Sequence, residues 1–399
     1  MDFEYWWLLA FPLFFGLGWL AARIDLKQLL SESRRLPASY FKGLNFLLNE
    51  QTDQAIEAFI EAVKADSEMI ELHFALGGMF RRRGEVDRAI RMHQSLLERE
   101  DLAEEKKLTA LFELGQDYLK AGLLDRAEQI FSDLEATRYS NASRESLLVI
   151  YALEKDWERA IAVARQLEQL SHRPYQIEIA HFYCEMAVRE NAHSNPTAAQ
   201  AHLQAALQAN RDCVRANMLL GDYAAAAGRF DEAIALWKRI ETQNPSYLPL
   251  VAERLLAGFR ATDRLVEGLD LLSSYLTRYG SQGMLNLDML NLVFQATLAN
   301  QGAEAAYQLV RDELHRNPTL LGLERLLELQ LLEAPAERRQ ELQLVRNLVH
   351  SHSVGLSLYR CEKCGFKARQ YFWQCPACGG WETFPARRGE EDAAAGRKN

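Results

Sequence analysis

The chain begins with an unbroken apolar segment. Residues 5–22 read YWWLLAFPLFFGLGWLAA and contain no charged side chain. As a helix, this segment would measure about 27 Å, which is close to the thickness of the hydrocarbon core of a bilayer. It is apolar on every side, whereas a helix at the surface of a soluble domain keeps a polar face. The pattern therefore predicts a transmembrane anchor over residues 1–23.

The charges that flank this segment predict its orientation. Asp2 and Glu4 precede it, and the basic residues that follow it are Arg23, Lys27, Arg34 and Arg35. Because positive charges accumulate on the cytoplasmic side, we expect a single pass with the amino terminus outward and the bulk of the chain in the cytoplasm. A cleaved signal peptide is the alternative, but it would start with basic residues and end at a small-residue cleavage site.

Beyond residue 36, the hydrophobic pattern becomes helical and repeats itself. Gly43 and Gly77 are thirty-four residues apart, as are Ala55 and Ala89. The same frame returns at Gly115, Tyr118, Gly122, Ala127 and Phe131, and again at Gly221, Gly228, Ala233, Trp237 and Pro245. This period, with small residues twelve apart, is typical of the tetratricopeptide repeat, a pair of antiparallel helices. The sequence therefore predicts an all-α tetratricopeptide superhelix over residues 36–349.

Weaker matches fill the intervals between these repeats. They are Tyr151, Ala160 and Ala164, then Ala199, Leu203 and Ala206, then Gly258, Gly268 and Leu272, then Ala306, Val310 and Pro318, with a capping pair over residues 320–349. We expect eight or nine helix pairs, in which a small residue of the first helix packs against a small residue of the second. An irregular helical bundle is the alternative, and three clear matches at a fixed spacing argue against it.

The first helix of each pair should line a concave wall that can hold a peptide or another protein. In the second pair this face carries Glu71, Phe74, Gly78, Arg81 and Arg82, and in the sixth it carries Arg215, Met218, Asp222 and Ala225. The run Arg81–Arg83 can receive an acidic partner or form a solvated helix end, and we favour the solvated end.

Four cysteines near the end of the chain carry the clearest chemical signal. Cys361 and Cys364 are joined as CEKC, and Cys375 and Cys378 as CPAC, with ten residues between the pairs. Two residues between thiolates let one turn aim both sulfurs at a common point, so two such turns predict a tetrahedral metal site. Four thiolates leave no open position for hydrolysis, so the site is structural or at most redox-sensitive. Disulfides or free thiols are the alternatives, and a reducing cytoplasm disfavours disulfides.

The cysteines belong to a predicted ribbon over residues 357–385, followed by a disordered tail over 386–399. The ribbon holds more aromatic surface than it can bury alone, from Tyr359, Phe366, Tyr371, Phe372, Trp373, Trp381 and Phe384. Because only nine residues separate Val349 from Tyr359, we expect it to pack against the last helical repeats. His350 and His352 are expected to be surface or packing residues, and Cys184 and Cys213 to be small buried groups.

Composition narrows the class of protein. The chain has 399 residues, of which 46 are Lys or Arg and 55 are Asp or Glu, giving a net charge of -9. That balance gives no general attraction for nucleic acid. We find no phosphate-binding loop, zinc-protease motif, nucleophile elbow or dinucleotide fingerprint, and the nine His are expected to be scattered over helical surfaces. The sequence therefore predicts that the protein is not an enzyme.

The order of these three parts resembles the lipopolysaccharide assembly protein B family of Gram-negative bacteria. The segments CEKCGF and CPACGGW carry that resemblance and are also similar to rubredoxin-type and zinc-ribbon knuckles. Rubredoxins separate their pairs by a longer loop, so iron and zinc both stay open. The resemblance implies that one metal ion is bound by Cys361, Cys364, Cys375 and Cys378, and that residues 5–22 form a bacterial inner-membrane segment.

The resemblance also implies a function and partners. Members of that family adjust lipopolysaccharide synthesis as adaptors between the membrane protease FtsH and the deacetylase LpxC, so that LpxC is degraded. The anchor helix, with Gly16 and Gly18 on its packing face, is expected to contact other inner-membrane proteins. The sequence also leaves open that two copies of the chain form a homodimer. The alternative function is a metal- or redox-responsive scaffold for envelope assembly with no proteolytic role.

Overall fold

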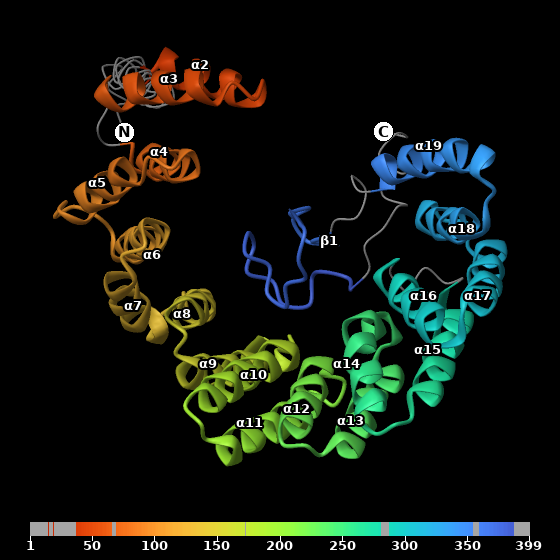
Figure 1. Cartoon of the computed structure of the whole chain (residues 1–399). Helices are drawn as coiled ribbons and strands as arrows, with labels where there is room; N and C mark the ends of the chain where they lie inside the picture. The colour runs from red at the N-terminus through yellow and green to blue at the C-terminus, as the bar shows by residue number, and fades with distance from the viewer. Residues whose placement is uncertain are drawn as a thin grey trace, which may run out of the picture. The chain divides into compact units, whose positions relative to one another are not determined.

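The computed structural model describes residues 37–65, 69–171, 173–280, 287–353 and 359–386, together with Phe15 and Trp19. The chain divides into two compact units, Met1–Ile150 and Tyr151–Asn399. Within each unit, consecutive helices pack as pairs, and a small ribbon belongs to the second unit (Figure 1). The predicted anchor, residues 1–23, lies outside the described residues apart from Phe15 and Trp19. In the described part of the chain, no helix is both long enough and apolar enough to cross a bilayer.

The described residues form eighteen α-helices, most of which pack in consecutive pairs, and this confirms the predicted all-α repeat. The first unit contains α2 (Ala38–Leu48), α3 (Thr52–Ala65), α4 (Ile70–Arg83), α5 (Val86–Leu97), α6 (Glu104–Ala121), α7 (Leu124–Asp133), η2 (Leu134–Ala136) and most of α8 (Ser140–Glu154). The second contains α9 (Trp157–Ser171), α10 (Gln176–Ala192), α11 (Pro196–Ala209), α12 (Val214–Ala226), α13 (Phe230–Gln243), η3 (Pro245–Tyr247), α14 (Leu248–Ala261), α15 (Leu265–Tyr279), α16 (Leu287–Gln301), α17 (Ala303–Arg316), α18 (Leu320–Glu333) and α19 (Ala336–Ser353).

Close contacts between glycines and rings set the spacing within several pairs. A Cβ added to the glycine of the first helix would lie within 3.0 Å of a side-chain ring sixteen residues further on. The glycine and ring pairs are Gly43 with Phe59, Gly77 with His93, Gly115 with Phe131, and Gly221 with Trp237. The expectation that small residues meet small residues is therefore wrong for these glycines. The missing Cβ leaves room for a flat ring, and the ring fills it.

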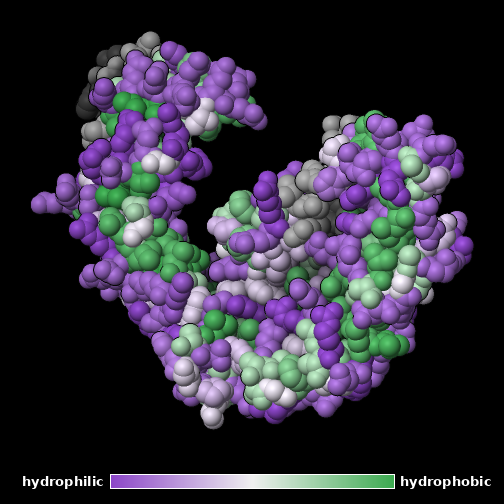
Figure 2. Space-filling model, viewed as in Figure 1, coloured by the Kyte–Doolittle hydropathy of each residue, from purple (hydrophilic) through white to green (hydrophobic). Residues whose placement is uncertain are grey.

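The recurring alanines of the second helices behave as expected. Ala55, Ala89, Ala127 and Ala233 are all completely buried. They allow the two backbones to approach closely while the ring four residues later covers the glycine. Apolar patches along the stacked helices interrupt an otherwise polar surface in Figure 2. In the second unit one continuous apolar cluster extends from Val214 in α12 to Ala296 in α16.

Ion pairs link neighbouring repeats at about one repeat period. Lys106 Nζ lies 2.8 Å from Glu71 Oε1, and Arg254 Nε lies 2.8 Å from Asp222 Oδ1. In the second pair, Arg81 binds Glu113 at 2.6 Å and Asp117 at 2.8 Å. The predicted solvated helix end is therefore wrong for Arg81, because the next repeat supplies its acidic partners.

The burial of individual side chains corrects two predictions and confirms a third. His73, His93 and His181 are buried, so the histidines are not all on helical surfaces. Cys184 and Cys213 are completely buried, as expected, with their sulfurs 4.0 Å apart. Ala386, which we assigned to the tail, is 1% exposed and packs with the core of the second unit.

Two adjacent glycines of α4 give a matched test of this packing. In Gly77→Ala the new Cβ would overlap the His93 ring, so we expect the free energy of unfolding to fall by about 1–3 kcal/mol. In Gly78→Ala the nearest atom to the new Cβ is 3.7 Å away, so stability should stay the same or rise by about 0.5–1 kcal/mol. Thermal unfolding of the full chain, followed by circular dichroism, measures both. Equal destabilisation by the two variants would contradict the account.

Candidate functional site

The two cysteine turns have the same backbone geometry. In the first, the N–H of Gly365 donates to the carbonyl of Cys361 at 2.9 Å, and the N–H of Cys361 donates to the carbonyl of Phe366 at 2.9 Å. In the second, Gly379 and Cys375 make the corresponding bonds at 2.8 Å. Gly365 and Gly379 have φ of 76° and 68°, a conformation that favours glycine. The spacing of the cysteines and the glycine that follows each pair therefore determine the backbone conformation of both turns, which we call the cysteine knuckles.

The knuckles bring the four sulfurs to one point. Cys361 Sγ lies 3.8 Å from Cys378 Sγ, and Cys364 Sγ lies 3.7 Å from Cys375 Sγ. All four ligand atoms lie within 4.8 Å of one another. Tetrahedral zinc with Zn–S bonds of about 2.3 Å places its sulfurs about 3.8 Å apart. The donor set and its spacing therefore fit one tetrahedrally coordinated metal ion of the kind that thiolates prefer, and do not choose between iron and zinc.

The environment also favours a thiolate at one ligand. Burial opposes ionisation of Cys361, but its hydrogen bond with Thr383 Oγ1 and the nearby amides of Lys363 and Cys364 lower its pKa to about 6. At Cys364, the amide of Phe366 lowers the pKa, but desolvation and the neighbouring thiols together outweigh it and raise the pKa. Four thiolates this close together repel one another, so they cannot all be ionised without a cation. A bound metal ion supplies that charge and stabilises the thiolate forms.

The ribbon has a very small core of its own. Its two short strands, β1 (Tyr359–Arg360) and β2 (Lys367–Ala368), pair antiparallel with Tyr359 opposite Ala368. Tyr359, Cys361, Cys375 and Phe384 are its buried core residues, with Phe372 packed beside them. So little buried area does not stabilise a domain, so the ribbon depends on its metal site and on contacts outside itself.

The first outside contact joins the ribbon to α10. The Trp381 ring stacks on His181, with centroids 4.7 Å apart and an interplanar angle of 14°. His181 Nε2 lies 2.9 Å from Glu382 Oε1, so the imidazole donates to the carboxylate. Phe182 meets the edge of Trp381 from the same helix. Burial lowers the pKa of His181 and outweighs the opposite effect of Glu382.

The second outside contact joins the ribbon to α12 and η3. The Trp373 ring stacks on Tyr247, with centroids 5.5 Å apart, and the Arg215 guanidinium lies 5.9 Å from the centre of the same ring. Tyr371 meets Tyr247 edge-on, and burial raises the pKa of both phenols. Arg215 is itself oriented by an ion pair with Glu185 at 2.8 Å. We call His181, Arg215 and Tyr247 the docking residues.

The docking position corrects one prediction. We expected the ribbon to pack against the last repeats, but its aromatic residues contact α10, α12 and η3, and it lies inside the curve of α9–α19 in Figure 1. Complementary rings and charges decide where the ribbon binds, and linker length only limits its reach. The sequence pointed to Arg215 on the inner face of the sixth pair, but we missed His181 and Tyr247. His350 is a largely exposed residue that bonds Glu324 at 3.0 Å, which confirms the expectation of a surface or packing residue.

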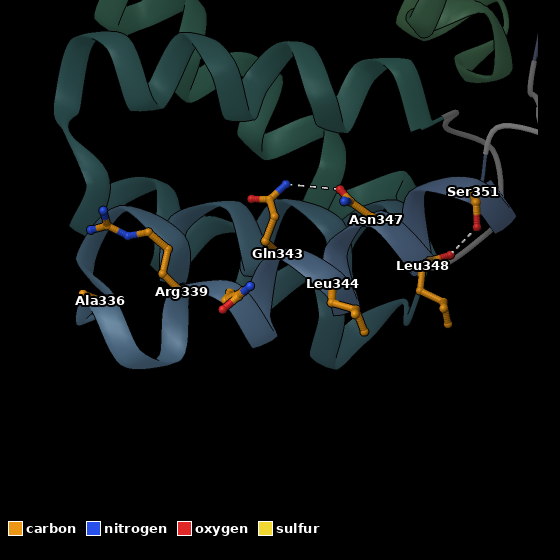
Figure 3. A pocket seen from close by; sticks show the side chains of 8 residues that line it. Ala336, Arg339, Gln343, Leu344, Asn347, Leu348 and Ser351 are labelled. Carbon is orange, nitrogen blue, oxygen red and sulfur yellow. Dashed lines mark hydrogen bonds between the residues drawn. The ribbon is translucent and has the colours of Figure 1, made fainter.

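The last helix, α19, presents a different kind of surface. Leu344 and Leu348 are 66% and 61% exposed, and in Figure 3 they point away from the neighbouring helices. Gln343 Nε2 donates to Asn347 Oδ1 at 3.1 Å on the same helix. A capping helix of a repeat stack usually has a polar outer face, so this surface departs from the rule. Among the described residues, the one group of cysteine, histidine and acidic side chains that could hold a metal ion is the four-cysteine cluster of the ribbon, so this surface is not a candidate metal site.

The fold and the ribbon define the class of protein. Residues 42–100, 112–173 and 186–247 match a family model described as tetratricopeptide repeat, and residues 359–385 match one described as rubredoxin metal binding domain. The chain is therefore a tetratricopeptide-repeat protein with a rubredoxin-type ribbon.

The curated relatives define the family. The chain is 34% identical to lipopolysaccharide assembly protein B of Escherichia coli strain K12 over 386 residues, which cover 96% of this chain and 97% of the relative. It is 31% identical to the protein of the same name from Haemophilus influenzae, covering 94% of this chain and 96% of that relative. The chain belongs to the lipopolysaccharide assembly protein B family, as its sequence features predicted.

The cysteine cluster leads to a test by metal analysis. We expect the full chain to carry one iron or zinc ion per molecule, and Cys375→Ser to lose it because Cys375 is a buried member of the tetrahedral set. Inductively coupled plasma mass spectrometry measures the stoichiometry and identifies the metal. The control is Cys184→Ala, which removes a buried thiol outside the cluster and should keep the metal. Full occupancy in Cys375→Ser would show that the four sulfurs are not the ligands.

The buried imidazole makes ribbon docking sensitive to pH. None of the described residues offers His181 Nδ1 a hydrogen-bond partner, so the docked ring is neutral and carries its proton on Nε2. An undocked imidazole would have a pKa of about 6.5 and would bind a proton that the docked form does not. The free energy of docking should therefore be constant with pH well above about 6.5 and become less favourable as the pH falls below that value.

Tryptophan fluorescence measures this effect, because Trp373 and Trp381 face water when the ribbon leaves the repeats. We expect the emission to shift to longer wavelength as the pH falls from neutral to about 5.5. Glu185, Arg215 and Glu382 are the charged groups around His181. His181→Gln keeps a donor for Glu382 but cannot titrate, so its emission should stay constant. An unchanged pH response in this variant would assign the effect to another group.

Proposed function

We propose that the protein is an inner-membrane-anchored cytoplasmic adaptor that regulates lipopolysaccharide synthesis by presenting LpxC to the protease FtsH. Family membership over nearly the whole chain is the observation that carries this proposal. The helical repeats support it, because stacked helix pairs form extended surfaces that bind other polypeptides. The role of Cys361, Cys364, Cys375 and Cys378 in this proposal is to hold one structural metal ion.

The mechanism we propose is an increase in effective concentration. An anchor at residues 5–22 confines the repeats to the inner leaflet, near a membrane protease, while the repeats hold a client. Neither step requires a covalent reaction by this chain. The same anchor would contact other inner-membrane proteins through its small residues and so allow them to control the adaptor.

A second candidate function is a metal- or redox-responsive scaffold for envelope assembly. Exposure of Cys364, one member of the four-cysteine cluster, is the observation that favours it. An oxidant can reach this sulfur more easily than the buried Cys361 and Cys375. Oxidation would release the metal, loosen the ribbon and change which partners the repeats bind.

Co-purification from solubilised membranes tests the first function. We expect the tagged full chain to capture FtsH and LpxC, and the cellular level of LpxC to rise several-fold when the chain is absent. In a chain whose residues 5–22 are replaced by an unrelated transmembrane segment, capture of LpxC should persist while capture of FtsH depends on the native anchor.

The outcomes separate the candidates. If neither a protease nor an enzyme of lipid synthesis is captured, the adaptor function is wrong. If capture changes only after treatment with an oxidant, and the level of LpxC does not respond to the chain, the metal-responsive scaffold is supported instead. Normal regulation by the chain with the replaced segment would show that the anchor is only a tether.

A further inference from the structure

The first unit contains a groove of its own. Residues of α2, α3, α4 and α6 line it, and its cavity volume is about 350 Å³. Its apolar floor is formed by Tyr40, Leu44, Leu47, Phe74 and Met79. Leu47 is 43% exposed, so it offers apolar surface that a partner can cover. We call this cavity the amino-terminal groove.

Most charges on the wall of the groove are already neutralised. Glu71 pairs with Lys106 at 2.8 Å, and the pKa of Glu71 is lowered by this bond. Arg81 pairs with Glu113 at 2.6 Å, and both of these side chains line the groove. These pairs lie between neighbouring repeats, and each supplies an opposite charge to a residue of the groove wall.

Arg82 is the exception among three consecutive arginines. Arg81 is held by the next repeat, and Arg83 is held by Asp53 at 2.8 Å and Glu85 at 3.1 Å. Arg82 also lines the groove, but it is exposed, and no acid among the described residues pairs with it. A guanidinium that borders an apolar cavity is well suited to bind a carboxylate with two parallel hydrogen bonds.

Gly78 keeps the space beside Arg82 open. It lies one helical turn before Arg82, on the same wall of the groove. Gly78 is buried, and a Cβ added there would have only Arg82 Nη1 nearby, at 3.7 Å, so a larger side chain at this position would have room to extend into the groove. The groove therefore combines an apolar floor, one cation without an acidic partner among the described residues, and a glycine whose missing side chain leaves space beside that cation.

We propose that the amino-terminal groove binds an extended acidic peptide segment of a client protein, in which an Asp or Glu lies close to a large apolar side chain. The carboxylate binds Arg82, and the apolar side chain lies against Leu44, Leu47 and Phe74. This inference rests on the proposed adaptor function and specifies the chemistry of the segment that the repeats would capture.

Selection of peptides from a random phage-display library against the purified full chain tests the proposal. We expect the selected sequences to place Asp or Glu next to Leu, Phe or Met. Against Arg82→Glu, which reverses the charge of the groove, the same library should yield Lys or Arg at that position. The matched control is Arg91→Glu, which reverses an exposed arginine of α5 that does not line the groove, and should select the same peptides as the native chain.

Fluorescence polarisation with one selected synthetic peptide gives the magnitude. We expect Arg82→Gln to weaken binding about tenfold, because one charge-assisted contact is lost. Gly78→Leu should abolish binding by filling the groove, while its circular dichroism spectrum stays native. If Arg82→Glu selects the same acidic peptides as the native chain, or Gly78→Leu binds the peptide with unchanged affinity, the proposal is wrong.

The peptide experiments and the co-purification experiment can fail separately, so failure of the groove and failure of the adaptor function are distinguishable. A charge-reversed selection together with failure to capture FtsH or LpxC would support the groove and overturn the adaptor function. Capture of both proteins by Arg82→Glu, together with selection of unrelated peptides, would overturn the groove and leave the adaptor function in place.

Discussion

Docking of the ribbon on the repeats is the contact on which the second unit depends. The ribbon cannot stabilise itself with two short strands and a few buried side chains, and the inner face of α10 and α12 carries rings and charges that need a partner. Stacking of Trp381 on His181 and of Trp373 on Tyr247 buries aromatic surface of the ribbon and covers the rings of the repeats. Because Trp373 lies two residues before Cys375 and Trp381 three residues after Cys378, we expect metal binding by the four cysteines to be energetically coupled to docking of the ribbon.

The two units use the same helical repeat in different ways. In the second unit the ribbon covers the inner face of α10, α12 and η3, so this part of the wall is occupied by the chain itself. In the first unit the described residues leave a groove with an unpaired Arg82. In our proposal, one set of helices binds the chain's own ribbon and another set binds a client.

Local features were predictable from sequence, and contacts between distant residues were less so. The cysteine knuckles depend on spacing and on glycines within a few residues, and the helix pairs depend on a repeated frame, so both could be read directly. The glycine at Gly77 was found, but its partner His93 was not, because the frame marks where space is needed and does not say what fills it. The acidic partners of Arg81 lie about one period away and could have been found by searching at that spacing. The docking site on His181 and Tyr247 required the curvature of the stack, which no local pattern contains.

The most direct test of this coupling is hydrogen exchange of the full chain before and after removal of the metal by a chelator. We predict that amides of α10, α12 and residues 245–247 lose protection together with those of the ribbon, while the amides of α2–α5 keep theirs. If the ribbon alone loses protection and α10 and α12 are unaffected, the metal site and the repeat surface are independent, and the account is wrong.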